Sequence, residues 1–173
     1  MGDVAIIRPA VAGDEPRLAL IGAATFLETF AGGIAGDALM AHCQKQHAAE
    51  TYHGYLLDGA RGWLAELGGA PVGYALLASP ELDAARSADL ELKRIYVLSR
   101  FHGGGVAARL LEAVIAAAAG CDRLLLGVKA NNARAIAFYR KQQFQQIATR
   151  RFDVGGTLYD DVVMARSINE KTI

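Results

Sequence analysis

Residues 90–111 constrain the fold of this chain more than any other segment; they read LELKRIYVLSRFHGGGVAARLL. The first part, up to Val97, is rich in β-branched and aromatic residues, which favour a strand. Three consecutive glycines follow from Gly103 to Gly105, and an Ala- and Leu-rich helical pattern begins directly after them. A strand, a glycine loop and a helix present a row of backbone N–H groups and a helix N-terminus, which commonly bind phosphate. We therefore expect the cofactor of this chain to bind at this segment.

Short apolar runs separated by turn residues predict the strands of the chain. They cover residues 4–8, 62–67, 71–77, 89–97, 123–128, 146–153 and 158–166. Asp14 is expected to cap a first helix, and residues 25–55 to form two helices, of which Asp37 caps the second. Residues 105–118 and 132–141 show further helical patterns. The order βαα-ββ-βαβα-ββ implies an α+β fold with a mixed sheet, because a βαβ crossover pairs its two strands in parallel.

The composition indicates one domain over residues 1–173 and argues against several classes of partner. The chain has 53% hydrophobic residues, enough for a core, and its 18 basic and 18 acidic residues cancel. A net charge of zero disfavours a nucleic-acid or membrane surface. No apolar run approaches the roughly 20 residues of a membrane span, and the N-terminus lacks the pattern of a signal peptide. A cytoplasmic location is therefore expected.

Cysteines and histidines give no sign of a metal site or a covalent nucleophile. Cys43 and Cys121 stand alone, so we expect free thiols and no metal. Neither cysteine lies in a motif suited to a nucleophile, which favours direct attack by the substrate. His42, His47 and His53 also lack the spacing of metal ligands and are interpreted as surface or packing residues.

Two other phosphate-binding motifs contain glycines and need to be distinguished from this one. The pattern Gly103-x-Gly105-x-x-Ala108 matches the dinucleotide fingerprint. That fold, however, places its glycines directly after an early strand and an acidic residue at the end of the next strand. Here several residues follow Val97 before the glycines, and the next strand ends without an acidic residue. A P-loop requires Gly-Lys-Ser/Thr, whereas Val106 follows Gly105, so both alternatives are disfavoured.

A second motif lies about one strand further along the chain, in residues 131–144, which read NNARAIAFYRKQQF. Together the two segments resemble the GCN5-related N-acetyltransferase (GNAT) superfamily. The family's coenzyme A loop, Gln/Arg-x-x-Gly-x-Gly/Ala, falls on His102, Gly105 and Ala107, and its pattern Asn-x-x-Ala-x-x-x-Tyr falls on Asn132, Ala135 and Tyr139. Two motifs in the right order are more specific than either motif alone.

The chain departs from the family pattern at two positions. His102 replaces the usual Gln or Arg; since that residue contacts the pyrophosphate mainly through its backbone, the change should be tolerated. Gln143 stands where a glycine often precedes Phe144, which affects the local turn more than the chemistry. Residues 24–30, 90–97 and 126–128 are in addition similar to bacterial PaiA-type spermidine/spermine N-acetyltransferases.

The resemblance implies a GNAT fold, a central mixed sheet of about seven strands flanked by about four helices. Acetyl-CoA is then the cosubstrate, and a backbone N–H near Val97 polarises its thioester carbonyl. The residues implied in cofactor binding are Ile95, Tyr96, Val97, His102, Gly103, Gly104, Gly105, Val106, Ala107, Asn132 and Tyr139. As an alternative, Asn132 is only the N-cap of its helix. Arg100, Arg109 and Lys141 are either phosphate ligands or solvated surface residues.

Two side chains are candidates for the proton transfers of amide formation. The resemblance places Tyr139 near the sulfur, where it can protonate the leaving thiolate; otherwise it is a core aromatic residue beside Phe138. Alkyl amines titrate near pH ~10, so a group has to accept a proton at neutral pH, and Glu91 on the central strand is the candidate base. The alternatives are that Glu91 faces solvent, or that water relays the proton with no single essential base.

The expected reaction is transfer of the acetyl group directly to a primary amine. A polyamine such as spermidine is the first acceptor expected, because an acidic cleft attracts a polycation. The residues expected to form that cleft are Glu28, Asp37, Glu81, Asp83, Asp89 and Glu91. The alternatives are another small amine, a peptide N-terminus, or a catalytically silent acyl-CoA-binding or regulatory module. A homodimer through the C-terminal hairpin is a further prediction, since dimers are common in this superfamily.

Overall fold

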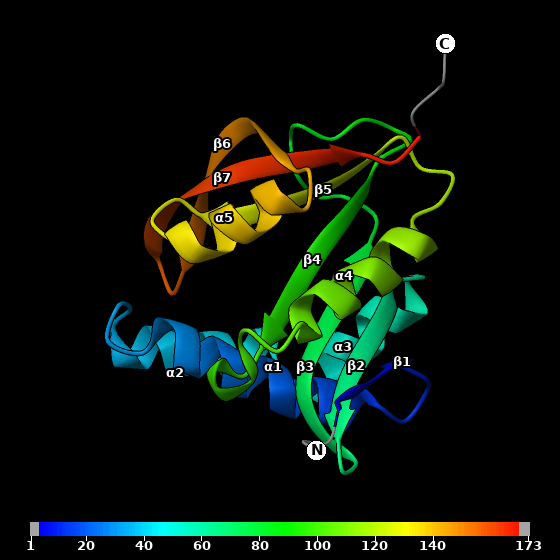
Figure 1. Cartoon of the computed structure of the whole chain (residues 1–173). Helices are drawn as coiled ribbons and strands as arrows, with labels where there is room; N and C mark the ends of the chain where they lie inside the picture. The colour runs from blue at the N-terminus through cyan, green and yellow to red at the C-terminus, as the bar shows by residue number, and fades with distance from the viewer. Residues whose placement is uncertain (1–3, 170–173) are drawn as a thin grey trace.

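The computed structural model describes residues 4–169, in which seven strands form one sheet in the order β1-β2-β3-β4-β5-β7-β6 (Figure 1). All neighbouring strands are antiparallel except β4 and β5, which are parallel. The strands are β1 (Ile6–Pro9), β2 (Arg61–Leu67), β3 (Ala70–Ala78), β4 (Leu90–Val97), β5 (Arg123–Lys129), β6 (Gln145–Val154) and β7 (Thr157–Ser167). The predicted α+β fold with a mixed sheet is confirmed.

Five α-helices accompany the sheet in this part of the chain, compared with the about four that the resemblance implied. They are α1 (Glu15–Phe30), α2 (Gly36–Gln46), α3 (Ala49–Leu57), α4 (Val106–Ala117) and α5 (Ala133–Lys141), and a 3₁₀ turn, η1 (Ser99–Phe101), lies between β4 and the glycine loop. The first helix continues to Phe30. It ends there because Gly32, just beyond it, has a φ of 83°, a left-handed conformation that terminates a helix. The N-cap of α2 is Ala35, so Asp37 lies in the first turn instead of capping the helix.

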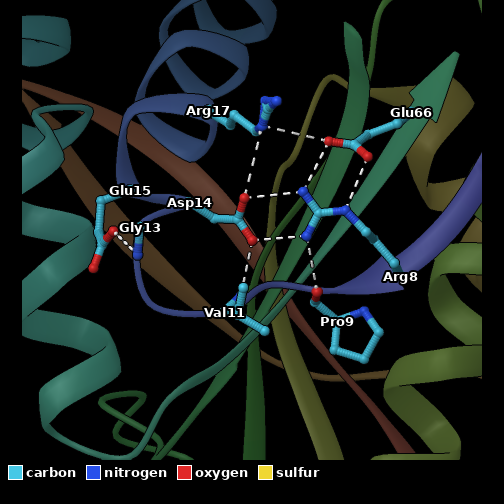
Figure 2. Close-up of polar contacts among 8 residues, drawn as sticks. All are labelled: Arg8, Pro9, Val11, Gly13, Asp14, Glu15, Arg17 and Glu66. Carbon is cyan, nitrogen blue, oxygen red and sulfur yellow. Dashed lines mark hydrogen bonds and ion pairs between the residues drawn. The ribbon is translucent and has the colours of Figure 1, made fainter. Parts of the chain in front are cut away.

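Asp14 occupies the N-cap position of α1, but its side chain does not cap the helix. Its carboxylate accepts hydrogen bonds from Arg8 Nη1 at 2.7 Å, Arg8 Nη2 at 2.9 Å and Val11 N at 2.9 Å (Figure 2). Arg8 Nε also donates to Oε2 of Glu66 on β2 at 2.9 Å. The predicted cap is wrong because the arginine takes the carboxylate. We call Arg8, Asp14 and Glu66 the Arg8 cluster; it joins β1, the following turn and β2.

Helices cover both faces of the sheet. On the α4 face, α4 and α5 bury residues such as Leu110 and Tyr139 in the main core. On the α1 face, α1 and α3 bury residues such as Leu18 and Tyr52 against β2, β3 and β4. Side chains alternate along a strand, so on β5 the even-numbered residues 124–128 face the main core and the odd-numbered residues point to the α1 face.

β4 and β5 separate soon after they begin. They pair only at Leu90 with Leu124 and at Glu91 with Leu125. β5 then continues beside β7, whereas β4 continues beside β3. Figure 1 shows the two strands diverging beyond this short pairing. We call the region between their separated parts the β4–β5 opening; along it, β4 has an edge without a neighbouring strand.

Gln143 forms the turn between α5 and β6 in a left-handed conformation, with φ of 67°. Phe144 N then donates to Tyr139 O at 3.0 Å, and the Phe144 ring enters the main core. A non-glycine residue in this conformation costs about 1–2 kcal/mol, which a glycine avoids. The turn therefore forms without the glycine that the family often has, at a cost in strain.

Candidate active site

The free edge of β4 presents two backbone N–H groups to the β4–β5 opening. Leu98 N donates to Val72 O at 2.9 Å, and antiparallel strands bond through every second residue. The N–H groups of Ile95 and Val97 therefore point away from β3, on either side of Tyr96. Because β5 has already diverged, no strand takes these donors. They are available to polar groups of a ligand lying in the opening.

The glycine loop leads into a helix N-terminus without a side-chain cap. Gly103 and Gly105 have φ of 81° and 78°, conformations that favour glycine. The first intrahelical bond of α4 runs from Arg109 N to Gly105 O at 3.0 Å, so the N–H groups of Val106 and Ala107 have no helical partner. Free N–H groups and the helix dipole at this end of α4 favour an anion such as a phosphate group.

His102 connects the end of β4 to α5 through both nitrogens of its ring. Nε2 donates to Val97 O at 2.7 Å, since a carbonyl can only accept, and Nδ1 accepts from Arg134 Nη1, since a guanidinium can only donate. The family pattern points to the backbone of His102 as a cofactor contact and gives no sign of Arg134, which this contact brings beside the glycine loop.

Tyr139 lies on α5, and its ring packs against Phe138 and Phe144 at centroid distances of 5.4 and 5.7 Å. Burial raises the pKa of its hydroxyl, and nearby Tyr96 adds to the effect. Within residues 4–169 the hydroxyl has no hydrogen-bond partner, yet it is not sealed from solvent. The ring is thus part of the core, while the hydroxyl stays protonated and is free to donate.

Two further candidates for the cofactor are engaged in local structure. Asn132 caps α5, with Oδ1 accepting from Ala135 N at 3.1 Å, as the structural alternative expected. Arg109 Nη1 donates to Ala5 O at 2.6 Å, beside β1. The Arg109 guanidinium therefore stabilises the packing of α4 near β1. This contact joins residues 104 positions apart, so it could not be predicted from the local sequence pattern.

Glu91 lies at the start of β4, where that strand still pairs with β5. It is only 4% exposed; Oε2 accepts from Glu81 N at 2.8 Å and lies 3.4 Å from Lys93 Nζ. The alternative that Glu91 faces solvent is therefore wrong. Ile95 lies four positions further along the strand, roughly 13 Å away. A proton released in the opening reaches Glu91 only through intervening groups or water.

Charged residues that the sequence analysis did not single out lie on the α1 face beside the opening: Arg94 on β4, Lys129 on β5 and Asp161 on β7. Asp161 is 6% exposed and accepts from Arg150 Nε at 3.3 Å. Burial raises the pKa of the Asp161 carboxyl, against the opposing effect of Arg150. In the sequence, these residues could have been recognised as charged residues within predicted strands, because a charge is costly to bury without a purpose.

The six carboxylates expected to form an acidic cleft do not come together. Glu91 and Asp89 lie at or just before the start of β4, where Asp89 pairs with Arg123 at 2.6 Å. Glu28 lies beyond the other end of β4 and accepts from Ser99 N at 2.9 Å and Ser99 Oγ at 2.6 Å. From Glu91 to Ser99 is eight residues, on the order of 25 Å of strand. The expected acidic cleft is therefore not formed by these residues.

Within residues 4–169, no group of three or more His, Cys, Asp or Glu residues is placed to hold a metal ion. The same part of the chain has no helix with the length and apolar character needed to cross a membrane. Both cysteines are free thiols, and burial raises the pKa of each. A thiol with a raised pKa is a weak nucleophile at neutral pH.

Comparison with known proteins shows relatives over most of the chain. The model of the acetyltransferase (GNAT) family matches residues 23–144. An uncharacterized N-acetyltransferase of Mycobacterium tuberculosis is 34% identical over 158 residues, which cover 90% of this chain and 98% of the relative. Both matches include the glycine loop and the free edge of β4.

Two solved structures share the fold. The PaiA N-acetyltransferase from Thermoplasma acidophilum, in complex with coenzyme A, has a TM-score of 0.74 and 17% identity, covering 96% of this chain and 99% of that one. The ribosomal-protein-alanine N-acetyltransferase from Brucella melitensis has a TM-score of 0.71 and 29% identity, covering 94% and 99%. The family match, the sequence relative and the shared fold lead to one conclusion: this chain belongs to the acetyltransferase (GNAT) family and is an acetyl-CoA-dependent N-acetyltransferase.

Proposed function

We propose that the protein transfers the acetyl group directly to a primary amine that enters the β4–β5 opening from the α1 face. The observation that carries this proposal is the position of the free β4 amides. On the α4 face, the same opening meets the glycine loop, the N-terminus of α4 and the Tyr139 hydroxyl. With the cofactor groups on that side, the α1 face is left for the acceptor.

The chain's own donors would hold acetyl-CoA, which supplies the activated acyl group when bound. The amides of Ile95 and Val97 would bind the thioester carbonyl and the pantetheine arm, since they are preorganised donors of the oxyanion-hole type. The amides of Val106 and Ala107 at the start of α4 would bind the pyrophosphate. Asn132 would position the start of α5, and thereby Tyr139, through its cap.

Two proton transfers accompany formation of the N–C bond and cleavage of the C–S bond. Tyr139 would donate a proton to the leaving thiolate, because its raised pKa keeps the hydroxyl protonated at neutral pH. Glu91 would receive the proton of the ammonium through water, given its burial and its distance along β4 from Ile95. This role for Glu91 combines the direct-base and water-relay alternatives.

Three acceptor classes deserve a place in the first assay. A polyamine such as spermidine is the acceptor that the PaiA-like segments favoured, although its expected acidic cleft is not formed. A peptide with an N-terminal alanine is a second class, because the Brucella melitensis protein, 29% identical, is by name a ribosomal-protein-alanine N-acetyltransferase. Small amines that carry a carboxylate or phosphate are the third class.

The proposal is tested by incubating the purified protein with acetyl-CoA and each amine and measuring release of free thiol. Replacement of Tyr139 by Phe keeps the ring and removes the hydroxyl; we expect kcat to fall roughly 100-fold, the usual size of a general-acid contribution. The Kd for acetyl-CoA should stay unchanged. Glu91→Gln should lower kcat by roughly 100-fold as well.

Phe144→Leu is the matched control, because it disturbs the packing around Tyr139 without touching the hydroxyl. It should lower the melting temperature while kcat of the folded enzyme stays within about twofold, far below a general-acid effect. Normal turnover by Tyr139→Phe would contradict the proton-donor role. Binding of acetyl-CoA with no turnover on any amine would contradict the proposed activity and favour a silent acyl-CoA-binding module.

A homodimer through the β6–β7 hairpin stays a prediction. The hairpin exposes Ile147 at 41% and Leu158 at 55%, which is apolar surface that a partner would cover. Light scattering of the wild type and of Leu158→Glu tests it: a mass of one chain for the wild type would contradict the dimer.

A further inference from the structure

Arg94 is a cation on the α1 face without a carboxylate partner among residues 4–169. Its Nη1 donates to the carbonyl oxygen of Gln46, at the end of α2, at 3.0 Å. The guanidinium lies over the rings of Tyr52 and Tyr55, at 5.2 and 5.5 Å from their centroids. A guanidinium has five N–H groups, so most of its donors are unused by these contacts. Arg94 is only partly buried, so its unused donors can meet a ligand.

Among the described residues, the polar neighbours of Arg94 include no acid. His47 is 5% exposed; its Nδ1 lies 2.9 Å from Tyr52 Oη, and Tyr52 Oη donates to Tyr74 Oη at 3.2 Å. Burial, together with Arg94 and His42 nearby, lowers the pKa of His47 to about 3, so its ring is neutral. Its Nε2 is buried and has no hydrogen-bond partner in the described chain. Because Tyr52 donates to Tyr74, the single ring proton lies on Nδ1 and Nε2 can only accept, so Arg94 is the anion-binding group here.

A second cation lies across the opening. Lys129 Nζ rests over the rings of Phe30 and Tyr159, at 5.4 and 4.6 Å from their centroids. Its charge acts on the carboxyl of Asp161 on the neighbouring strand, but the two form no ion pair within 4 Å. Other cations on this side are neutralised, as Lys93 is by Glu81 at 2.7 Å. Two cations that rest on aromatic rings therefore flank the opening on the face that the acceptor uses.

A cation removed from water without an anion is unfavourable, and a ligand that brings the anion relieves that cost. We infer that Arg94 binds an anionic group of the acceptor, a carboxylate or a phosphate, so that the preferred substrate is an amine carrying such a group. This inference rests on the proposed function. The cofactor groups are excluded as the anion, because they lie toward the α4 face.

The position of Arg94 limits the size of the acceptor. Arg94 directly precedes Ile95, whose amide faces the opening, and adjacent Cα atoms are about 3.8 Å apart. The bound anion and the reacting amine can therefore both be supplied by one small molecule. A polycation such as spermidine brings no anion and meets the Arg94 charge instead, so it is a poor acceptor.

Matched acceptors test this inference in the wild-type enzyme. Glycine, β-alanine and γ-aminobutyrate are each compared with their carboxamides, and phosphoethanolamine with ethanolamine; spermidine is the polycation. We expect kcat/KM to be roughly 10- to 100-fold higher for the anionic member of the best pair, the usual effect of a charged hydrogen bond. The three amino acids report the preferred spacing, and the phosphate pair distinguishes the two anions.

Arg94→Gln should remove this preference: KM for the anionic acceptor rises roughly 10- to 100-fold, while the carboxamide and the KM for acetyl-CoA change little. Arg94→Lys should restore part of the preference. Arg61→Gln is the matched control, because Arg61 Nη2 also donates to a helix-terminal carbonyl, Ala117 O at 2.5 Å, at another site. It should leave the preference intact.

Equal kcat/KM for both members of every pair in the wild type would overturn the inference, and so would an equal loss on both acceptors in Arg94→Gln. Failure of the proposed function looks different, since no amine is then acetylated although acetyl-CoA binds. In that case calorimetry with the same amino acids and carboxamides, in the presence of coenzyme A, decides the inference. Binding of the carboxylates alone supports it, and no binding or equal binding contradicts it.

Discussion

Two partly buried arginines in this molecule are satisfied in opposite ways. Arg8 lies between the carboxylates of Asp14 and Glu66, with both N–O distances below 3 Å (Figure 2). Arg94 has two aromatic rings, one carbonyl and no carboxylate among the described residues. The first site is complete within the protein, whereas the second has donors left over. Arg8 is therefore a cation that stabilises the fold, whereas Arg94 is a cation with donors available to bind a ligand.

The surroundings of each arginine follow from its place in the fold. Arg8 connects β1 to β2 at the edge of the sheet, away from the opening, and its partners come from the turn before α1 and from β2. Arg94 lies on β4 itself, a central strand, close to the edge of that strand that has no neighbouring strand. Unsatisfied polar groups persist in native proteins mainly where function needs them, since elsewhere they only reduce stability.

The largest expected effect is loss of stability on replacing Arg8 by Met. The variant leaves the carboxylates of Asp14 and Glu66 side by side without their shared cation. We expect a loss of about 3 kcal/mol, the low end for a broken buried ion pair, because the Arg8 side chain is 31% exposed and Arg17 remains nearby. In a chain of this size the melting temperature should fall by roughly 6–12 °C.

Arg17→Met is the control for that measurement. Arg17 Nε lies 3.7 Å from Asp14 and 3.6 Å from Glu66, and its side chain is 46% exposed. Its removal should cost less than about 1 kcal/mol, as for a surface ion pair. The kcat of folded Arg8→Met should match the wild type. If the two variants melted at the same temperature, the Arg8 cluster would have no special part in stability.

A smaller effect is expected from acid. Hydrogen bonding to Arg8 lowers the pKa of Asp14 to about 2, from an ordinary value of 3.8. A carboxyl with a lowered pKa stabilises the fold above its unfolded pKa, and this contribution disappears as the pH falls from about 4 to 2. The amount is about 2 kcal/mol. Urea unfolding of wild type and Asp14→Asn over this range should show a steeper loss for the wild type; parallel curves would contradict it.

The smallest expected effect is on the stability of Arg94→Met. This change removes two ring contacts and one hydrogen bond, but it also removes a desolvated charge and leaves no carboxylate unpaired. The free energy of unfolding should therefore change by less than about 1 kcal/mol. Thermal unfolding of Arg8→Met and Arg94→Met under one condition checks the contrast. An equal, large loss in both would show that Arg94 is as structural as Arg8.

Features encoded by neighbouring residues were predicted well. Residues 89–97, the three glycines and the helical pattern after them appear as β4, the glycine loop and α4. The alternation that marks a strand and the repeat that marks a helix depend on residues a few positions apart, so they are legible in one sequence. The bounds of the first helices were harder to predict, because the end of α1 depends on Gly32 within a stretch of mixed pattern.

Features that depend on distant pairs were not predicted. Asp14 has the right residue type for a cap, but Arg8 and Glu66 on two strands determine its role. Arg94 meets the end of α2, 48 residues away, and His102 meets Arg134, 32 residues away. The acidic residues expected in one cleft are divided between the two ends of β4. Nothing in the local pattern of these residues specifies which of them become neighbours.

The sequence by itself determined the strand, the glycine loop, the helix after it and the position of Tyr139 on the following helix, because each rests on local residue preferences and short spacings. Only the tertiary structure decided that β4 leaves β5 after Glu91, which frees the amides of Ile95 and Val97. It also decided that Arg8 is neutralised while Arg94 is not. Ion pairs and strand separation arise from packing between elements far apart in the chain, where one residue's charge is matched or left unmatched by the fold as a whole.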